Sequence, residues 1–94
     1  MTIIYRLLEI NNEIKEEYYK SIAGTARAAS MKYREYLLSK ELLYTEGVNP
    51  PDITEESVDE LFVKARDVYE EYATVTLVCM EEYTLSITEV ELRG

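Results

Sequence analysis

The sequence contains no histidine, no tryptophan and a single cysteine, Cys79, among 94 residues. Without histidine the chain cannot build a histidine-dependent triad, a histidine metal site or an imidazole general base. One cysteine excludes an intramolecular disulfide and a zinc site made of several thiolates. Because Cys79 lies between Val78 and Met80 in a strand-like run, we expect it to be a buried apolar residue rather than a nucleophile.

Glycine and long apolar runs are also scarce. The three glycines, Gly24, Gly47 and Gly94, are isolated, so the chain has no glycine loop of the kind that cradles phosphates. No apolar run approaches the roughly 20 residues of a membrane span, and no basic leader precedes a long apolar stretch as in a signal peptide. Together with the lone cysteine, these features predict a cytoplasmic protein without a cofactor.

Basic residues are outnumbered by 19 acidic residues to 10, which gives a formal net charge of −9. The imbalance lies entirely in one half of the chain. Residues 1–47 hold seven acids and seven bases, whereas residues 48–94 hold twelve acids and three bases. Nucleic acids and anionic membranes require cationic ligands, so the composition argues against direct binding to either. It favours a basic protein as the partner.

The first twenty residues predict a strand and then a helix. Residues 2–10 are rich in β-branched and aromatic side chains, which favours a strand, although a helical stripe through Ile3 and Leu7 is an alternative. The pair Asn11-Asn12 resembles a helix N-cap with acids in the following turn. A helix from there would place Ile14, Tyr18 and Ile22 on one stripe.

A second helix is predicted up to residue 46. The small-residue run 23–30 forms either a tight turn between helices or a close helix contact, because Gly24 costs about 1 kcal/mol in a helix interior. Gly47 and the prolines at 50 and 51 predict the end of the helix. Its apolar positions are Ala26, Ala29, Tyr33, Tyr36, Leu37, Leu43 and Tyr44.

Residues 53–72 form the clearest amphipathic pattern in the chain. Asp52 or Thr54 is expected to open this helix, and Ser57 with Glu60 has the spacing of a capping box. Acidic side chains occupy the face opposite an apolar stripe. The apolar stripe consists of Val58, Leu61, Phe62, Ala65, Val68, Tyr69 and Tyr72, and the acidic face of Glu56, Asp59, Glu60, Asp67, Glu70 and Glu71.

Two strands are predicted at the C-terminal end, over residues 73–80 and 83–92, joined by a turn at Glu81-Glu82. Tyr83, Leu85 and Ile87 are in phase with each other. The apolar phase then shifts to Val90 and Leu92, which predicts a bulge or a bend in the last strand.

The acidic face of the third helix suggests a function. Like charges three and four residues apart repel by a few tenths of a kcal/mol, so a face of one sign indicates selection for a negative field. Carboxylates at i and i+4 lie roughly 6 Å apart along the axis, similar to the phosphate spacing of a nucleic-acid strand. In size and charge the chain therefore resembles the small acidic proteins called DNA mimics, which are often encoded by phages. High solubility alone is the alternative explanation of these charges.

Two other functions fit parts of the sequence. Acids one turn apart in Glu13-Ile-Lys-Glu16-Glu17 and Glu56-Ser-Val-Asp59 could hold Mg²⁺ between facing helices. This pattern resembles the all-helical nucleotide pyrophosphohydrolases and implies Mg-dependent nucleotide hydrolysis, although the order within the first motif and the gap between the motifs depart from that family. The nine tyrosines either rim a small core or form the apolar surface through which a structural or adaptor subunit binds its partner.

Together these observations predict one compact acidic domain over residues 1–94, with an α+β fold and an all-helical bundle as the alternative. The expected function is inhibition of a nucleic-acid-binding protein by occupation of its basic surface, without catalysis and without a metal. A homodimer is a further hypothesis, based on unpaired strand edges and tyrosine content. The expected partner-binding residues are Glu55, Glu56, Asp59, Glu60, Asp67, Glu70, Glu71, Glu81 and Glu82.

Overall fold

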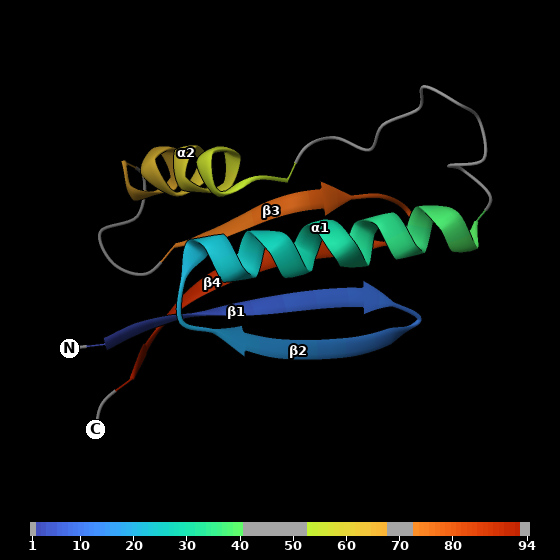
Figure 1. Ribbon diagram of the computed structural model, residues 1–94, viewed down its shortest axis with the longest axis horizontal. Coiled ribbons are helices and arrows are strands. Elements are labelled where there is room, and N and C mark those ends of the chain that lie inside the picture. Colours follow the sequence, from blue (N-terminus) through green and yellow to red (C-terminus); the bar gives the residue numbers. More distant parts are fainter. Residues whose placement is uncertain (1, 41–52, 68–72, 93–94) are drawn as a thin grey trace.

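The computed structural model describes residues 2–40, 53–67 and 73–92 (Figure 1). It has an α+β fold, as predicted, and is not the all-helical alternative. No helix among these residues is long and apolar enough to cross a membrane. The elements are β1 (Thr2–Asn11), β2 (Glu13–Tyr19), α1 (Ile22–Ser39), α2 (Glu55–Arg66), β3 (Thr74–Cys79) and β4 (Thr84–Leu92).

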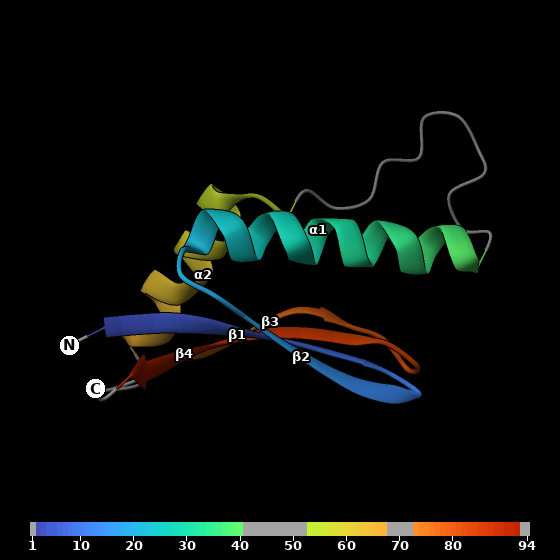
Figure 2. The ribbon, with the colours of Figure 1, turned by 60° about the horizontal axis from the view of Figure 1, so that its bottom comes forward.

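The four strands form one antiparallel sheet in the order β2-β1-β4-β3. Both helices cover the same face of this sheet (Figure 2). The first and last strands of the chain are therefore the two central strands, each paired on both sides. Strands β2 and β3 form the edges, and both carry features that discourage further pairing: a lysine at position 15 and a register shift near Leu77.

The helix predicted from Asn11 onwards is wrong, because residues 13–19 form β2 and complete a hairpin with β1. The turn places Asn12 at φ 63°, in the left-handed region that asparagine tolerates better than most residues. Asparagine favours helix caps and left-handed turns for related reasons, so the sequence alone did not separate the two. Tyr18, expected on a buried helical stripe, is instead exposed on β2.

Helix α1 begins at Ile22, and its N-cap is Ser21, whose hydroxyl accepts a hydrogen bond from the Gly24 amide at 3.0 Å. Gly24 therefore lies in the first turn of the helix and does not break it. The predicted apolar stripe is confirmed at Ala26, Ala29, Tyr33, Tyr36 and Leu37, all of which are buried. Leu43, Tyr44 and the stop signal at residues 47–51 lie outside the described residues.

The C-terminal hairpin is confirmed, with its turn at Glu81-Glu82. The predicted bulge is not in the last strand: β4 keeps its register with β1, and the register shift lies in β3, between Thr76 and Val78. The misleading residue is Glu89, which continues the inward series of Leu85 and Ile87. A pattern based on hydrophobic residues does not predict that a glutamate side chain points into the core.

The core lies between the sheet and the helices. Leu7, Leu85 and Ile87 from the central strands pack with Val58 and Phe62 from α2. The Phe62 ring lies 5.8 Å from that of Tyr5, and Tyr83 stacks on Tyr36 at 4.0 Å between centroids. Most described tyrosines therefore fill or rim the core. The other buried core residues are Ala26, Ala29, Tyr33, Tyr36, Leu37, Ala73, Val75 and Tyr83.

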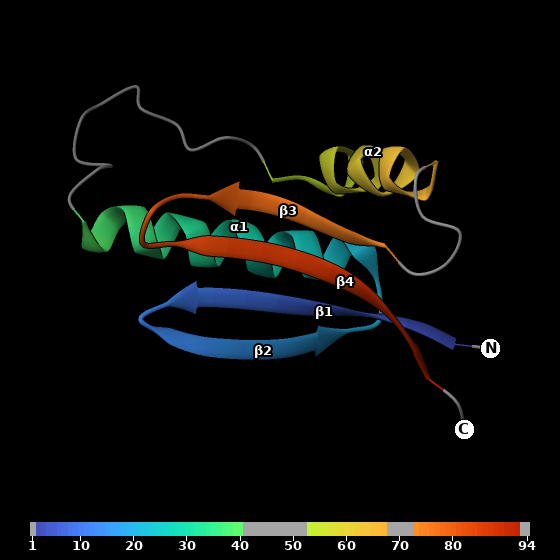
Figure 3. The same cartoon turned by 180° about the vertical axis from the view of Figure 1, so that it is seen from behind.

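The opposite face of the sheet is covered by no described element, and Figure 3 views the molecule from this side. Because side chains alternate between the faces of a strand, the register defines which residues lie here. A contact of 2.9 Å between the hydroxyls of Thr74 and Thr88 agrees with this assignment. The open sheet face consists of Thr2, Ile4, Arg6, Leu8, Ile10, Ile14, Glu16, Tyr18, Thr74, Thr76, Cys79, Thr84, Ser86, Thr88, Val90 and Leu92.

Candidate interaction surface on the second helix

Helix α2 begins with a reciprocal capping box. The Thr54 hydroxyl accepts from the Ser57 amide at 3.1 Å, and the Ser57 hydroxyl accepts from the Thr54 amide at 2.9 Å. Thr54 is thus the N-cap, which was one of the two predicted starts of this helix. Ser57 is the third helical residue, so it does not cap a box with Glu60. Glu55 and Glu56 occupy the first turn, where the helix dipole favours negative charge.

The inner face of α2 fixes the helix to the rest of the molecule. Val58 and Phe62 are fully buried, and Ala65 is partly buried against the same core. Leu61, expected on this stripe, lies at its margin and is 36% exposed. Because residues four positions apart share one face of a helix, burial of Val58 and Phe62 leaves the opposite face in solvent.

The exposed sides of α2 are acidic: Glu56 and Glu60 lie opposite the buried stripe, and Glu55 and Asp59 lie on its flank. Glu55, Glu56, Asp59 and Glu60 are all exposed, and we call these four residues the acidic α2 surface. They form two i, i+4 pairs, Glu55 with Asp59 and Glu56 with Glu60, each spaced about 6 Å along the axis. The structure therefore places four of the predicted partner-binding residues together in solvent.

The two bases of α2 lie at one end of this surface, and Lys64 follows Glu60 by four residues on the same face of the helix. Lys64 and Arg66 lie in the last turn, beyond the four acids. Arg66 points to the sheet, where its guanidinium donates to the Glu89 carboxylate from both Nε (3.1 Å) and Nη2 (2.8 Å). Glu89 is 5% exposed, so this ion pair gives a buried acid its counter-ion, while the Arg66 side chain itself stays 45% exposed.

The remaining predicted partner-binding residues are not part of the same surface. Asp67 is exposed at the C-cap of α2, and Glu70 and Glu71 lie outside the described residues. Glu81 and Glu82 are exposed in the β3–β4 turn. That turn lies beside the β1–β2 turn, because Thr84 pairs with Ile10, whereas α2 lies at the other end of the sheet (Figure 1).

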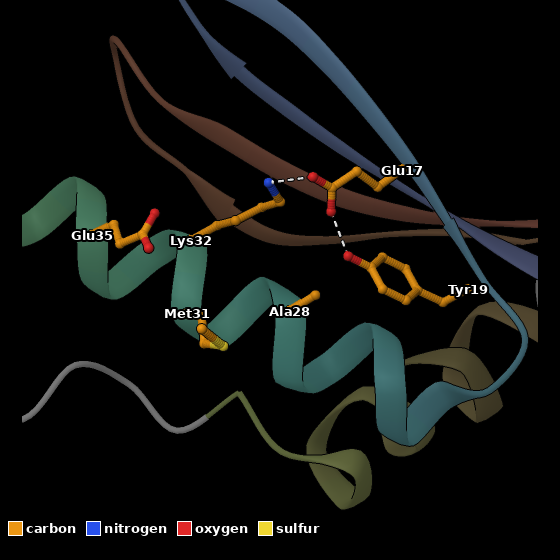
Figure 4. Close-up of a pocket in the computed structure, with 6 residues that line it drawn as sticks. All are labelled: Glu17, Tyr19, Ala28, Met31, Lys32 and Glu35. Atoms are coloured by element: carbon orange, nitrogen blue, oxygen red, sulfur yellow. Dashed lines mark hydrogen bonds and ion pairs between the residues drawn. The ribbon is translucent and has the colours of Figure 1, made fainter.

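A second cluster of charges lies where β2 faces α1, and sequence reasoning missed it. Glu17 of β2 forms an ion pair of 2.9 Å with Lys32 of α1, and it accepts a hydrogen bond from the Tyr19 hydroxyl (Figure 4). These residues border an open hollow of about 200 Å³ with Met31 and Glu35. Because residues 13–19 were expected to be helical, the alternation of Glu17 and Tyr19 toward α1 was not visible.

The contacts in this cluster shift the acid–base properties of its members. The hydrogen bond from Tyr19 and then that from Lys32 lower the pKa of Glu17. The same bond to Glu17, with some burial, raises the pKa of Tyr19 to about 12. The Glu17 contact also raises the pKa of Lys32. All three groups therefore keep their ordinary charge at neutral pH, so none of them is suited to act as a general acid or base. The cluster instead links β2 to α1.

A similar hydrogen bond between a tyrosine and a glutamate joins the C-terminal hairpin to β1. The Tyr83 hydroxyl donates to the Glu9 carboxylate at 2.6 Å. Burial, and then the bond to Glu9, raise the pKa of Tyr83. Glu9 and Glu89 are thus both on the helix side of the sheet, and each has a protein partner.

The magnesium motifs expected from the sequence do not share a site. Glu13, Glu16 and Glu17 lie on a strand, so Glu16 points to the open sheet face while Glu13 and Glu17 lie on the other face. Glu56 and Asp59 are in solvent on α2. Within the described parts of the chain, no group of three or more metal-binding side chains is arranged to hold an ion.

Cys79 lies at the end of β3 and is exposed, contrary to the expectation of a buried residue. It is in a strand, as predicted, but at the edge of the sheet and on the face that the helices do not cover. Comparison of the chain with protein-family models, with curated proteins and with solved structures gives no match.

Proposed function

We propose that this protein binds a basic surface of a nucleic-acid-binding protein through the acidic α2 surface and thereby blocks access of that protein to nucleic acid. It would act in the cytoplasm, as a binding protein without a catalytic step. The observation that carries the proposal is the arrangement of Glu55, Glu56, Asp59 and Glu60 in solvent on a helix anchored by Val58 and Phe62. The four charges are thus held in fixed positions relative to each other.

Electrostatics favours a cationic partner. A patch of one sign raises the local concentration of oppositely charged ligands and their association rate by roughly 10- to 1,000-fold. The two i, i+4 pairs repeat a carboxylate about every 6 Å of axis, which is compatible with cationic side chains that otherwise contact successive phosphates. The ion pair between Arg66 and Glu89 supports the same proposal, because Glu89 compensates the charge of one of the two bases at the end of α2.

The proposal can be tested with a variant in which the acidic α2 surface is neutral: Glu55→Gln, Glu56→Gln, Asp59→Asn and Glu60→Gln. Proteins captured from a lysate by the wild-type chain at low salt would be purified and loaded with a labelled DNA duplex. We expect the wild-type chain to displace the duplex at low salt and to lose this ability as salt rises. The neutral variant should associate at least about 10-fold more slowly at low salt.

A matched control removes the same number of carboxylates elsewhere: Glu13→Gln, Glu35→Gln, Glu81→Gln and Glu82→Gln. These residues are exposed and lie away from the acidic α2 surface, so this variant has the same net charge as the neutral variant. We expect it to displace DNA nearly as well as the wild type. Equal loss in both variants would assign the effect to net charge alone, and unchanged displacement by the neutral variant would refute the proposal.

A further inference from the structure

The open sheet face differs in composition from the rest of the molecule. Of its sixteen residues only Arg6 and Glu16 are charged, although 29 of the 94 residues of the chain carry a charge. Its net charge is zero in a chain of net charge −9. The apolar members are Ile4, Leu8, Ile10, Ile14, Tyr18, Val90 and Leu92.

Several of these apolar side chains are in solvent. Ile14 is 70% exposed, Tyr18 54% and Leu92 49%. Scattered apolar residues are ordinary on a protein surface, but these seven lie on the adjacent strands β2, β1 and β4 of one face that carries only two charges. The composition therefore indicates a face that is covered in the working form of the protein.

Arg6 gives a second, independent observation on this face. It lies on the central strand β1, and its Nε is buried without a hydrogen-bond partner among the described residues. A buried donor without a partner costs free energy, and because the chain itself shields Nε, an acceptor from outside would contact the terminal nitrogens of the guanidinium. Glu16, on the neighbouring strand, forms no ion pair with Arg6 within the chain: the ion pairs in the described residues join Lys32 to Glu17 and Arg66 to Glu89.

We propose that a second copy of this chain packs on the open sheet face and forms a twofold symmetric dimer. In such a dimer residue i contacts residue j of the second copy and the reverse, so Arg6 of each copy can reach Glu16 of the other. The pairing gives Arg6 an acceptor and Glu16 a cation in one reciprocal contact. A self-complementary pair of opposite charges on a neutral face fits a second copy better than an acidic or basic partner.

The overall charge and the size of the face agree with this occupant. Two chains of net charge −9 repel, and they approach most favourably through the one neutral face, which leaves both acidic α2 surfaces outside. With about 3.3 Å per residue along a strand and about 4.8 Å between strands, the face covers about 500 Å² per copy. Two copies would bury about 1,000 Å², which reaches the lower bound for a specific interface.

The experiment is sedimentation equilibrium or light scattering after size exclusion, at a chain concentration of about 100 μM, above the micromolar Kd of weak interfaces. We expect the wild type at twice the 11.0 kDa mass of one chain. The variant Ile14→Glu with Tyr18→Glu should weaken the dimer by about 100-fold, because it sets like charges against each other in an apolar contact. Both side chains are exposed, so the fold should persist, as circular dichroism would verify.

The matched control is Met31→Glu with Leu38→Glu, which adds the same charges to exposed apolar positions of α1. This variant should remain dimeric. Glu16→Arg should weaken the dimer, and Arg6→Glu combined with Glu16→Arg should restore it. A monomeric wild type, or a dimer that Ile14→Glu with Tyr18→Glu leaves intact, would overturn the proposal and assign the face to another partner or the dimer to another surface. These outcomes do not depend on the acidic α2 surface.

Discussion

The two faces of the sheet differ in whether their buried polar groups have partners within the chain. On the helix side, Glu89 pairs with Arg66, and Glu9 accepts from Tyr83, so each buried or half-buried carboxylate has a partner within the chain. On the open side, the Nε of Arg6 is buried and has no partner among the described residues. Native interiors satisfy such groups almost without exception. The helix side therefore behaves as a finished interior, whereas the open side leaves one buried donor unpaired among the described residues.

This contrast also predicts opposite responses to salt. Binding through the acidic α2 surface depends on charge and should weaken as salt screens it. Association through the open sheet face depends chiefly on apolar contact between chains that repel overall, so it should persist at high salt. Matched substitutions, which make the same change on each face of the sheet, test this difference between the faces.

Loss of a large side chain gives the greatest expected difference. Phe62→Ala should lower the free energy of unfolding by about 3–5 kcal/mol, because Phe62 is fully buried against Tyr5 and the core. Ile14→Ala should change it by less than about 0.5 kcal/mol, because Ile14 is largely in solvent in the monomer. Urea denaturation of dilute samples would measure both values. Similar costs for the two variants would erase the distinction between the faces.

Loss of an arginine should give the next largest difference. Arg66→Met leaves Glu89 buried without its cation and should cost about 2–3 kcal/mol of folding free energy. Arg6→Met removes a donor that has no partner in the described chain and should cost less than about 0.5 kcal/mol in a dilute monomer. It should nevertheless weaken the dimer. A large loss of monomer stability in Arg6→Met would show that this guanidinium is already satisfied within one chain.

Loss of a tyrosine hydroxyl should have a smaller effect that depends on pH. Tyr83→Phe removes the bond to Glu9 and should cost about 1–2 kcal/mol near neutral pH. Tyr18→Phe, on the open face, should leave monomer stability unchanged. Urea midpoints at neutral pH would compare the two.

The pH dependence follows from the raised pKa values of Tyr83 and of Tyr19, which is about 12. A raised pKa means that the folded state favours the neutral phenol. This contribution is complete below the unfolded pKa of 10.0 and is lost as pH rises through the folded pKa. Stability should therefore fall from about pH 10 upward, and less steeply in Tyr83→Phe. Tyrosinate absorbance would follow the ionisation of the tyrosines. If the stability of Tyr83→Phe fell with pH as steeply as that of the wild type, this assignment would be contradicted.

The smallest expected effect concerns the start of the acidic helix. Thr54→Ala removes one half of the capping box and should cost about 1 kcal/mol. Ser39→Ala, which removes a hydroxyl bond to the Tyr36 carbonyl in the last turn of α1, should cost less. Thermal denaturation would compare the two. If the Thr54 variant matched the wild type, α2 would be held by the burial of Val58 and Phe62 alone.

Prediction from the sequence worked best where a pattern was local and complete. Strand β1, the two strands of the C-terminal hairpin and the amphipathic pattern of α2 were all predicted, because alternation or a 3.6-residue period is visible in each. Three acids of the candidate surface, Glu56, Asp59 and Glu60, followed directly from the phase of Phe62 and Val58. The helix predicted over residues 53–72 corresponds to α2 at Glu55–Arg66, and residues 68–72 lie outside the described residues.

Prediction failed where one residue type serves two structures. Asn12 could cap a helix or form a left-handed turn, and only pairing with β1 decided for the turn. Glu89 read as a solvent position because its partner Arg66 is 23 residues away. Cys79 read as buried because a strand alone does not reveal whether it lies at an edge.

The sequence by itself determined the charge of the second half of the chain, the amphipathic α2 and most of the strands, because composition and periodicity are properties of neighbouring residues. Tertiary structure alone decided that β2 is a strand, that Glu89 and Glu9 are paired, and that Glu81 and Glu82 lie far from the acidic α2 surface. It also decided which sheet face the helices leave open. The reason is physical: register and layer packing join residues that are distant in the chain, and burial of the helix side fixes which half of each alternating strand remains outside.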